Sequence, residues 1–179
     1  MSDRNAWVGP FVGRLTRLAN PDNPDRAALA HLRRGLGDPA GTLARVGWLF
    51  NGVPDDRADN ALNSAVLAAG LFAWTKGRCE NASNVNFGKA SGAGLSEDDK
   101  KQREKRFTAL LDADPTELPF LLRQAVTLIE GTSLDWAALI THLMSWDHPD
   151  RWVQKDWARG FWWTSTTAEQ PAESTAATE

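Results

Sequence analysis

The chain has 179 residues, with 20 Lys and Arg against 23 Asp and Glu, 42% hydrophobic residues, nine Trp and one Cys. These values are typical of one globular domain, and they exclude a wholly disordered chain, a collagen-like fibre and a Cys-rich scaffold. No apolar run approaches the length of a membrane span, and the first residues lack the pattern of a secretory signal. We therefore expect a cytoplasmic protein that contacts no membrane and requires no cofactor.

The net charge of −3 comes from the end of the chain. Residues 164–179 contain three glutamates and no cation, so residues 1–163 are neutral overall. This last segment is rich in Thr and Ala and has no large apolar side chain to bury. The sequence predicts a disordered acidic tail at 164–179 after a single domain at 1–163.

Helical periodicity runs through most of the predicted domain. Apolar residues recur at steps of three and four, which is typical of helices with one buried face. The predicted helices cover 7–18, a segment from Asn23-Pro24 to Gly35, 39–50, 59–74, a segment from Ser96 to Leu111, a segment from Asp114 to Ile129, a segment from Ser133 or Asp135 to Met144, and 149–163. The segment 59–74 is apolar on most of its circumference, which favours a central position. In the last helix we expect Trp152, Val153, Trp157 and Phe161 on the inner side.

One long segment breaks this pattern. Residues 77–94 are rich in Gly, Asn and Ser, and we expect a loop there. No alternating apolar pattern with hairpin turns is found, so no strand is predicted. The expected fold is all-α, a bundle of about eight helices with room for two lobes.

Candidate catalytic groups are sparse. The three histidines lie far apart with no metal-ligand spacing, and we interpret His142 as a packed or surface residue. Cys79 has no motif around it, and the Gly-rich segment 88–94 lacks the spacing of a phosphate-binding loop. We do not predict an enzyme, and no catalytic or metal-binding residue is assigned.

Basic residues are the better candidates for a functional surface. Arg33 and Arg34 end one helix, and Arg151, Lys155 and Arg159 follow one another at four-residue steps beside Trp152. The run from Lys100 to Arg106 includes Lys101, Lys105 and Arg106, and Arg123 borders a buried helical face. Such rows can contact phosphates without sequence preference. The alternative interpretation of the same residues is a solvated, ion-paired surface without a binding role.

The order of short motifs resembles that of the CasB family, the small subunit of the type I-E CRISPR surveillance complex (Cascade). The resemblance covers residues 5–163 and rests on the succession Leu32-Arg33-Arg34, Arg57, Phe87-Gly88-Lys89-Ala90, Glu104-Lys105-Arg106-Phe107, Leu110-Leu111, Asp114, Leu122-Arg123, Asp135-Trp136, Leu139, Leu143, Trp146 and Trp157-Ala158-Arg159-Gly160-Phe161. No single motif is specific, and the succession carries the match.

The resemblance implies an all-α, non-catalytic subunit present as two copies in a ribonucleoprotein. It implies contacts with the large subunit, the backbone subunits, a second copy of the chain, the guide RNA and the target DNA. A nuclease-helicase would be recruited indirectly. The subunit would stabilise the guide–target heteroduplex and the displaced strand during R-loop formation in antiviral defence.

The residue correspondence adds Arg57 and Lys89 to the candidate cations. The full set of expected nucleic-acid-binding residues is Arg33, Arg34, Arg57, Lys89, Lys101, Lys105, Arg106, Arg123, Arg151, Lys155 and Arg159. Lys89 and Lys105 stand where the resemblance leads us to expect Arg, which keeps the charge but loses the bidentate fork. The alternative hypothesis is a helical protein–protein adaptor that makes no direct contact with nucleic acid.

Overall fold

The fold is described by a computed structural model that covers residues 5–55, 60–93 and 97–167, without the side chains of 97–100 and 164–167. The helices are α1 Val8–Leu18, α2 Arg26–Arg34, α3 Pro39–Val46, α4 Ala61–Trp74, α5 Phe87–Gly92, α6 Glu97–Leu111, α7 Leu118–Val126, α8 Trp136–Met144 and α9 Trp152–Thr167. Short 3₁₀ turns follow α3 at Gly47–Phe50 and α7 at Thr127–Ile129. The all-α prediction is confirmed, with nine α-helices in the described ranges.

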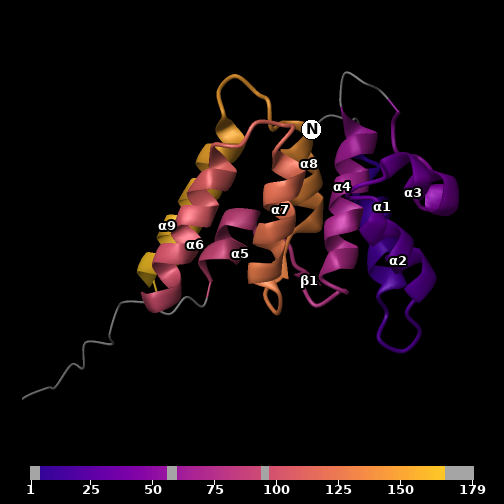
Figure 1. The fold of residues 1–179 in the computed structure, drawn as a ribbon, viewed down its shortest axis with the longest axis horizontal. Helices are drawn as coiled ribbons and strands as arrows, with labels where there is room; N and C mark the ends of the chain where they lie inside the picture. The colour runs from indigo at the N-terminus through magenta and orange to yellow at the C-terminus, as the bar shows by residue number, and fades with distance from the viewer. Residues whose placement is uncertain (1–4, 56–59, 94–96, 168–179) are drawn as a thin grey trace, which may run out of the picture.

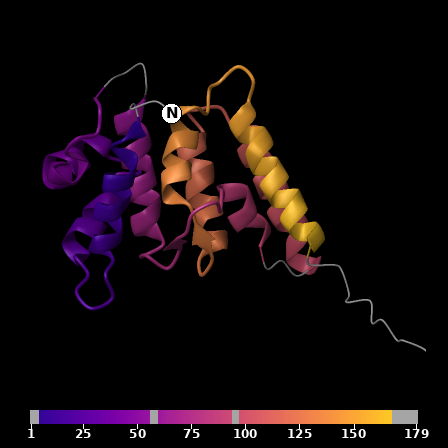
Figure 2. The same ribbon diagram turned by 180° about the vertical axis from the view of Figure 1, so that it is seen from behind.

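The helices are arranged along the long axis of the molecule (Figure 1). Helices α1–α4 form one half, α7 and α8 lie beside α4, and α5, α6 and α9 form the other end. Turned by 180°, the molecule presents α9 and α8 to the viewer in place of α6 and α7 (Figure 2). Within the part of the chain that the structure describes, no helix is long and apolar enough to cross a membrane.

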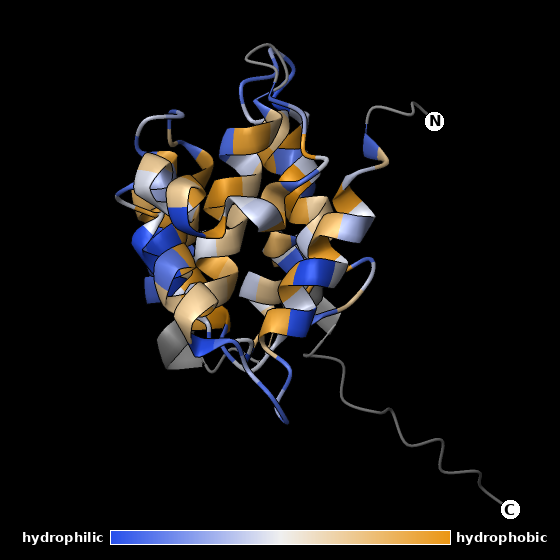
Figure 3. Cartoon of the chain, turned by 90° about the vertical axis from the view of Figure 1, so that its right-hand side faces the viewer, coloured by the Kyte–Doolittle hydropathy of each residue, from blue (hydrophilic) through white to orange (hydrophobic). Residues whose placement is uncertain are grey.

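Helix α4 is the central element, as its uniform apolar character predicts. Ten of its residues are buried, and it packs against α2 on one side and against α7 and α8 on the other. The hydropathy view shows hydrophobic positions along the helices and hydrophilic positions at their outer edges and in the connecting loops (Figure 3). One continuous core therefore joins the two halves.

Among the described residues, four helices begin at a side-chain cap. A carboxylate or amide oxygen accepts the backbone N–H three residues later, at 2.8–2.9 Å, which satisfies a donor that the helix itself leaves unpaired. The capping residues are Asp25, Asp38, Asn86 and Asp135. The prediction of Asn23-Pro24 as the start of the second helix is therefore wrong by two residues, because Asp25 supplies the cap.

The segment 77–94 is not the loop that its composition suggests. It contains the two-residue strand β1 Glu80–Asn81 and the helix α5, in which Phe87 and Ala90 are buried. Strand β1 pairs in parallel with β2 Ser133–Leu134. The expectation of no strand was also wrong, although this pairing involves only two residues on each side.

The Gly-rich composition of α5 serves close packing against α9. A Cβ added to Gly88 would lie 1.8 Å from the backbone oxygen of Trp157, and one added to Gly92 would lie 2.6 Å from that of Phe161. On the α9 side, a Cβ at Gly160 would meet the side chain of Asn86 and the backbone of Lys89. The two backbones therefore touch at positions where only glycine fits.

The last helix differs from its prediction in two ways. It begins at Trp152 and extends to Thr167, past the predicted domain boundary at 163. Val153, Trp157 and Phe161 are buried as expected, but Trp152 is 39% exposed and the prediction of an inward position for it was wrong. The remainder of the predicted tail, 168–179, lies outside the described residues.

Candidate nucleic-acid interface

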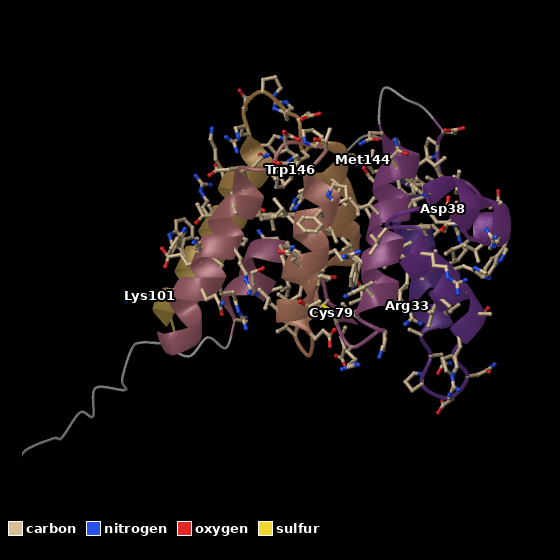
Figure 4. All side chains as sticks on the ribbon, viewed as in Figure 1. Arg33, Asp38, Cys79, Lys101, Met144 and Trp146 are labelled. Atoms are coloured by element: carbon tan, nitrogen blue, oxygen red, sulfur yellow. The ribbon has the colours of Figure 1, made fainter. Side chains whose placement is uncertain are left out.

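The predicted cations are distributed over both ends of the molecule. Arg33 lies on the half that contains α2, whereas Lys101 lies at the far end on α6 (Figure 4). Arg57 lies outside the described residues. The structure thus separates the candidates into a group on α2, a group on α6, a group on α9 and two single residues, Lys89 and Arg123.

The clearest cationic surface belongs to α9. Lys155 and Arg159 are exposed and four residues apart, so they share one face of the helix. Together with Trp152, His142 and Asp156 they line a hollow of about 400 Å³ between α8 and α9. The opposite face of α9 is buried, with Trp157 stacked on Phe87 and Phe161 stacked on Phe107 at centroid distances of 4.9 and 4.3 Å.

His142, which lines this hollow, belongs to a hydrogen-bonded network with α9. The indole N–H of Trp157 donates to Nδ1 of His142 at 2.8 Å, which requires His142 to be neutral at that nitrogen. Burial lowers the pKa of His142, while the nearby carboxylates of Asp156 and Asp135 act in the opposite direction. His142 was expected to be a packed or a surface residue, and at 9% exposure it is packed.

Asp156 is held by α5. The side-chain amide of Asn86 donates to Oδ2 of Asp156 at 2.6 Å and to its backbone oxygen at 3.2 Å. Asn86 also caps α5, so one side chain starts that helix and ties it to α9. The orientation of the α9 cations therefore depends on the α5–α9 contact.

Arg151 has a structural partner. Its guanidinium donates to the backbone oxygen of Leu111 and lies 3.9 Å from the carboxylate of Asp112. Leu111 is the last residue of α6, where a cation stabilises the unpaired carbonyls and the negative end of the helix dipole. Arg151 thus connects the end of α6 to the start of α9, although its side chain is 54% exposed.

The α6 cations lie on an exposed face. Lys101 and Lys105 line a shallow hollow of about 320 Å³ with Glu104 and Thr108. Arg106 is also exposed, next to buried Phe107. A solvated, ion-paired face would require the pairs Glu97–Lys101 and Asp99–Arg103. The side chains of Glu97 and Asp99 lie outside the described set.

Lys89 and Arg123 each make a contact within the chain. The ammonium of Lys89 donates to the backbone oxygen of Asn84 at 3.0 Å. The guanidinium of Arg123 lies 5.1 Å from the ring centroid of Trp74, a cation–π contact between α7 and α4. Both side chains remain on the exposed surface.

The α2 cations end a helix. Arg33 donates to the backbone oxygen of Leu29 at 3.3 Å, and Arg34 lines a small hollow of about 100 Å³ with His31, Asp38 and Arg45. Sequence reasoning missed Arg45, because its proximity to Arg34 depends on the turn between α2 and α3. That turn is signalled by Gly35, Gly37 and Pro39.

Groups that could perform chemistry are packed or dispersed. Burial raises the pKa of the Cys79 thiol to about 11, so it carries almost no thiolate near neutral pH. A cluster of three or more metal-ligating side chains is absent from the part of the chain that the structure describes. The exposed cations are therefore the features that require a functional explanation.

Comparison with known proteins identifies the family. The family model described as "CRISPR-associated protein Cse2" matches residues 28–162. The CRISPR-associated protein Cse2 of Thermus thermophilus is 34% identical over 152 residues, which cover 80% of this chain and 83% of that protein. The chain belongs to the Cse2 family.

Solved structures agree with this assignment. CasB from Thermus thermophilus has a TM-score of 0.71 and 32% identity, covering 90% of this chain and 99% of that one. A Cse2-family protein of the same organism gives the same values, so both family names describe this fold. A chain of a CRISPR RNA-guided surveillance complex shares the fold at a TM-score of 0.70 and 22% identity, covering 92% of this chain and 96% of that chain. The resemblance to the CasB family is confirmed.

Proposed function

We propose that this Cse2-family chain is a non-catalytic subunit of a type I-E RNA-guided surveillance complex. In this role it binds the phosphate backbone of nucleic acid and stabilises the guide RNA–target DNA heteroduplex and the displaced strand during R-loop formation. Its partners are the large and backbone subunits, a second copy of itself, the guide RNA and the target DNA.

The observation that carries the proposal is the Cse2 fold combined with exposed cations on separate helices. A chain of a surveillance complex has this fold. Lys101, Lys105 and Arg106 on α6 and Lys155 and Arg159 on α9 are solvent-exposed. Cations on a rigid helical face can contact a strand at several phosphates without reading its bases.

Contacts with the nucleic-acid backbone suit a subunit of an RNA-guided complex. Base pairing with the guide supplies sequence specificity, so a subunit that supports the R-loop needs contacts with the backbone and not with base edges. Each cation group on this chain is small. An assembly that places several weak contacts along one strand can still hold it, because each further contact is intramolecular.

The first experiment is a mild affinity purification of the tagged chain from its own cells, followed by mass spectrometry and an RNA gel. Co-elution of several partner proteins with one discrete RNA would support the proposal. The chain eluting alone and without RNA, while the other subunits are expressed, would contradict it.

A second experiment separates nucleic-acid contact from an adaptor role. The double variant K155E/R159E should assemble with its partners but bind single-stranded DNA more weakly, with a reduced dependence on salt. The matched control is R17E/R26E, which makes the same charge change at exposed positions on α1 and α2. Equal behaviour of the two variants would favour the adaptor hypothesis.

A further inference from the structure

Exposed aromatic side chains are concentrated on α9. Among the described residues, five large hydrophobic side chains are exposed, and three of them are Trp152, Trp162 and Trp163 of this helix. Trp163 is 67% exposed and Trp152 is 39% exposed. The same helix buries Trp157 and Phe161, so it carries aromatic side chains on both its inner and its outer face.

Two of the exposed tryptophans flank a pair of cations. Trp152, Lys155, Arg159 and Trp163 are separated by three, four and four residues, which places them in one row along the helix. The row from Trp152 to Trp163 is about 16 Å long at the rise of an α-helix, enough for several nucleotides. The Arg159 guanidinium lies 5.9 Å from the ring centroid of Trp163, so cation and ring are adjacent.

The hollow beside this row combines aromatic and cationic side chains. It is lined by Trp152, by the cations Lys155 and Arg159, and by His142. The rings of Trp152 and His142 are nearly perpendicular, at 82°, with their centroids 5.4 Å apart, and Trp152 remains 39% exposed. The carboxylate of Asp156 also lines the hollow, but its Oδ2 accepts the Asn86 amide.

We propose that the α9 row Trp152–Lys155–Arg159–Trp163 is a base-stacking platform for single-stranded nucleic acid. Bases stack on the two indoles while the cations between them contact the connecting phosphates. This combination is the one used by proteins that bind single strands without sequence preference. The inference rests on the proposed nucleic-acid role and adds that α9 selects unpaired over paired strands, because only unpaired bases can present their faces.

The test uses the full chain with a short fluorescein-labelled oligothymidylate, and with the same length of duplex DNA, across a range of salt concentrations. Trp163→Leu and Trp152→Leu should each weaken single-strand binding by about fivefold to a hundredfold. They should leave the slope of log affinity against log salt unchanged and duplex binding unaffected, because no charge is removed. Trp48→Leu is the matched control, since Trp48 is 56% exposed and lies on the other half of the chain.

The outcomes distinguish this inference from the proposed function. If K155Q/R159Q weakens binding and lowers the salt slope while Trp163→Leu changes nothing, the platform is disproved and the backbone role stands. Three other results would each overturn the platform. The Trp variants could lose equal affinity for single strand and duplex, they could lose binding to partner proteins but keep their affinity for DNA, or the unmodified chain could fail to bind the oligothymidylate. The co-purification experiment tests the proposed function independently. Trp163 is highly exposed and keeps the test valid even if Trp152→Leu disturbs His142.

Discussion

The helix contacts at Gly70 and at Gly88 both rely on glycine, and they differ in what lies opposite the missing side chain. At the contact of α4 with α2, a Cβ on Gly70 would meet the side chain of Leu36, just after α2, at 2.8 Å, and the backbone oxygen of Leu32 at 3.2 Å. Between α5 and α9, a Cβ on Gly88 would meet the backbone of Trp157 at 1.8 Å. In the first contact the nearest atoms belong to a movable side chain and the backbone lies farther away, whereas in the second all the nearest atoms belong to the backbone.

The difference determines which contact can adapt. Leu36 is partly exposed beside a cavity of about 570 Å³ lined by residues of both halves, so it has space to move. The α5–α9 contact has no such freedom, and it positions Lys89, Asn86 and the outer face of α9. We therefore expect the end of the molecule that carries the α9 cations to be the less tolerant one.

The strongest test of this comparison is Gly88→Ala. The added methyl would force α5 away from α9, and we expect a loss of about 3 kcal/mol or more in the free energy of unfolding. Urea unfolding followed by circular dichroism measures it. Gly70→Ala should cost only about 1 kcal/mol, because Leu36 can change rotamer.

Gly13→Ala is the control for helix propensity. Gly13 lies inside α1 with no atom within 4 Å of an added Cβ, so this change should stabilise the chain by about 0.5–1 kcal/mol. Equal losses for Gly88→Ala and Gly70→Ala would show that the two contacts do not differ as described.

A smaller effect is expected for Trp157→Phe at the same end. The change removes the N–H that donates to His142 and leaves a buried nitrogen without its partner, at a cost of about 2 kcal/mol. Trp48→Phe, on an exposed ring in the other half, should change the unfolding free energy by less than about 0.5 kcal/mol. A loss for Trp157→Phe no larger than that of Trp48→Phe would refute the network.

The His142 network also predicts acid sensitivity. Because the folded chain lowers the pKa of His142 below the ordinary value of 6.5, the unfolded chain takes up its proton first as the pH falls. This residue's contribution to stability is therefore complete above pH 6.5 and is lost as the pH falls from there through the folded-state pKa. The urea midpoint of unfolding should decrease as the pH is lowered from neutral to mildly acidic. In His142→Gln the midpoint should depend less on pH. His31→Gln, on α2, is the control, and an unchanged slope in His142→Gln would contradict the assignment.

The same contrast explains how far the sequence predicts the structure. The position of α4 follows from its sequence, since a segment rich in Ala and Leu that is apolar on most of its circumference predicts a central helix. The α5–α9 contact was missed because Gly88 and Gly92 were interpreted as loop residues. Their four-residue spacing, the Asn86 cap and the apolar Phe87 and Ala90 were the signals of a short helix packed closely against another.

The candidate site was predicted only in part. Charge spacing correctly grouped Lys155 with Arg159, because residues four apart in a helix share a face. It could not show that Arg151 contacts the end of α6, or that Arg34 lies near Arg45, because these contacts depend on tertiary structure. The exposure of Trp152 was missed for a related reason, since an aromatic residue at helical spacing fits a core and an outer face equally well.

The smallest predicted effect concerns Arg123, which links α7 to α4 between the two contacts compared above. Arg123→Ala should lower the free energy of unfolding by about 0.5–1 kcal/mol, since it removes a cation–π contact with Trp74 at an exposed site. A double-mutant cycle with Trp74→Leu isolates this coupling, and Arg123→Lys keeps the charge but loses the planar stacking. If Arg123 also contacts phosphate, Arg123→Ala lowers the salt dependence of DNA binding while Arg123→Lys preserves it. A coupling near zero together with an unchanged salt dependence would remove Arg123 from the interface, and would leave α6 and α9 as the cationic surfaces to pursue.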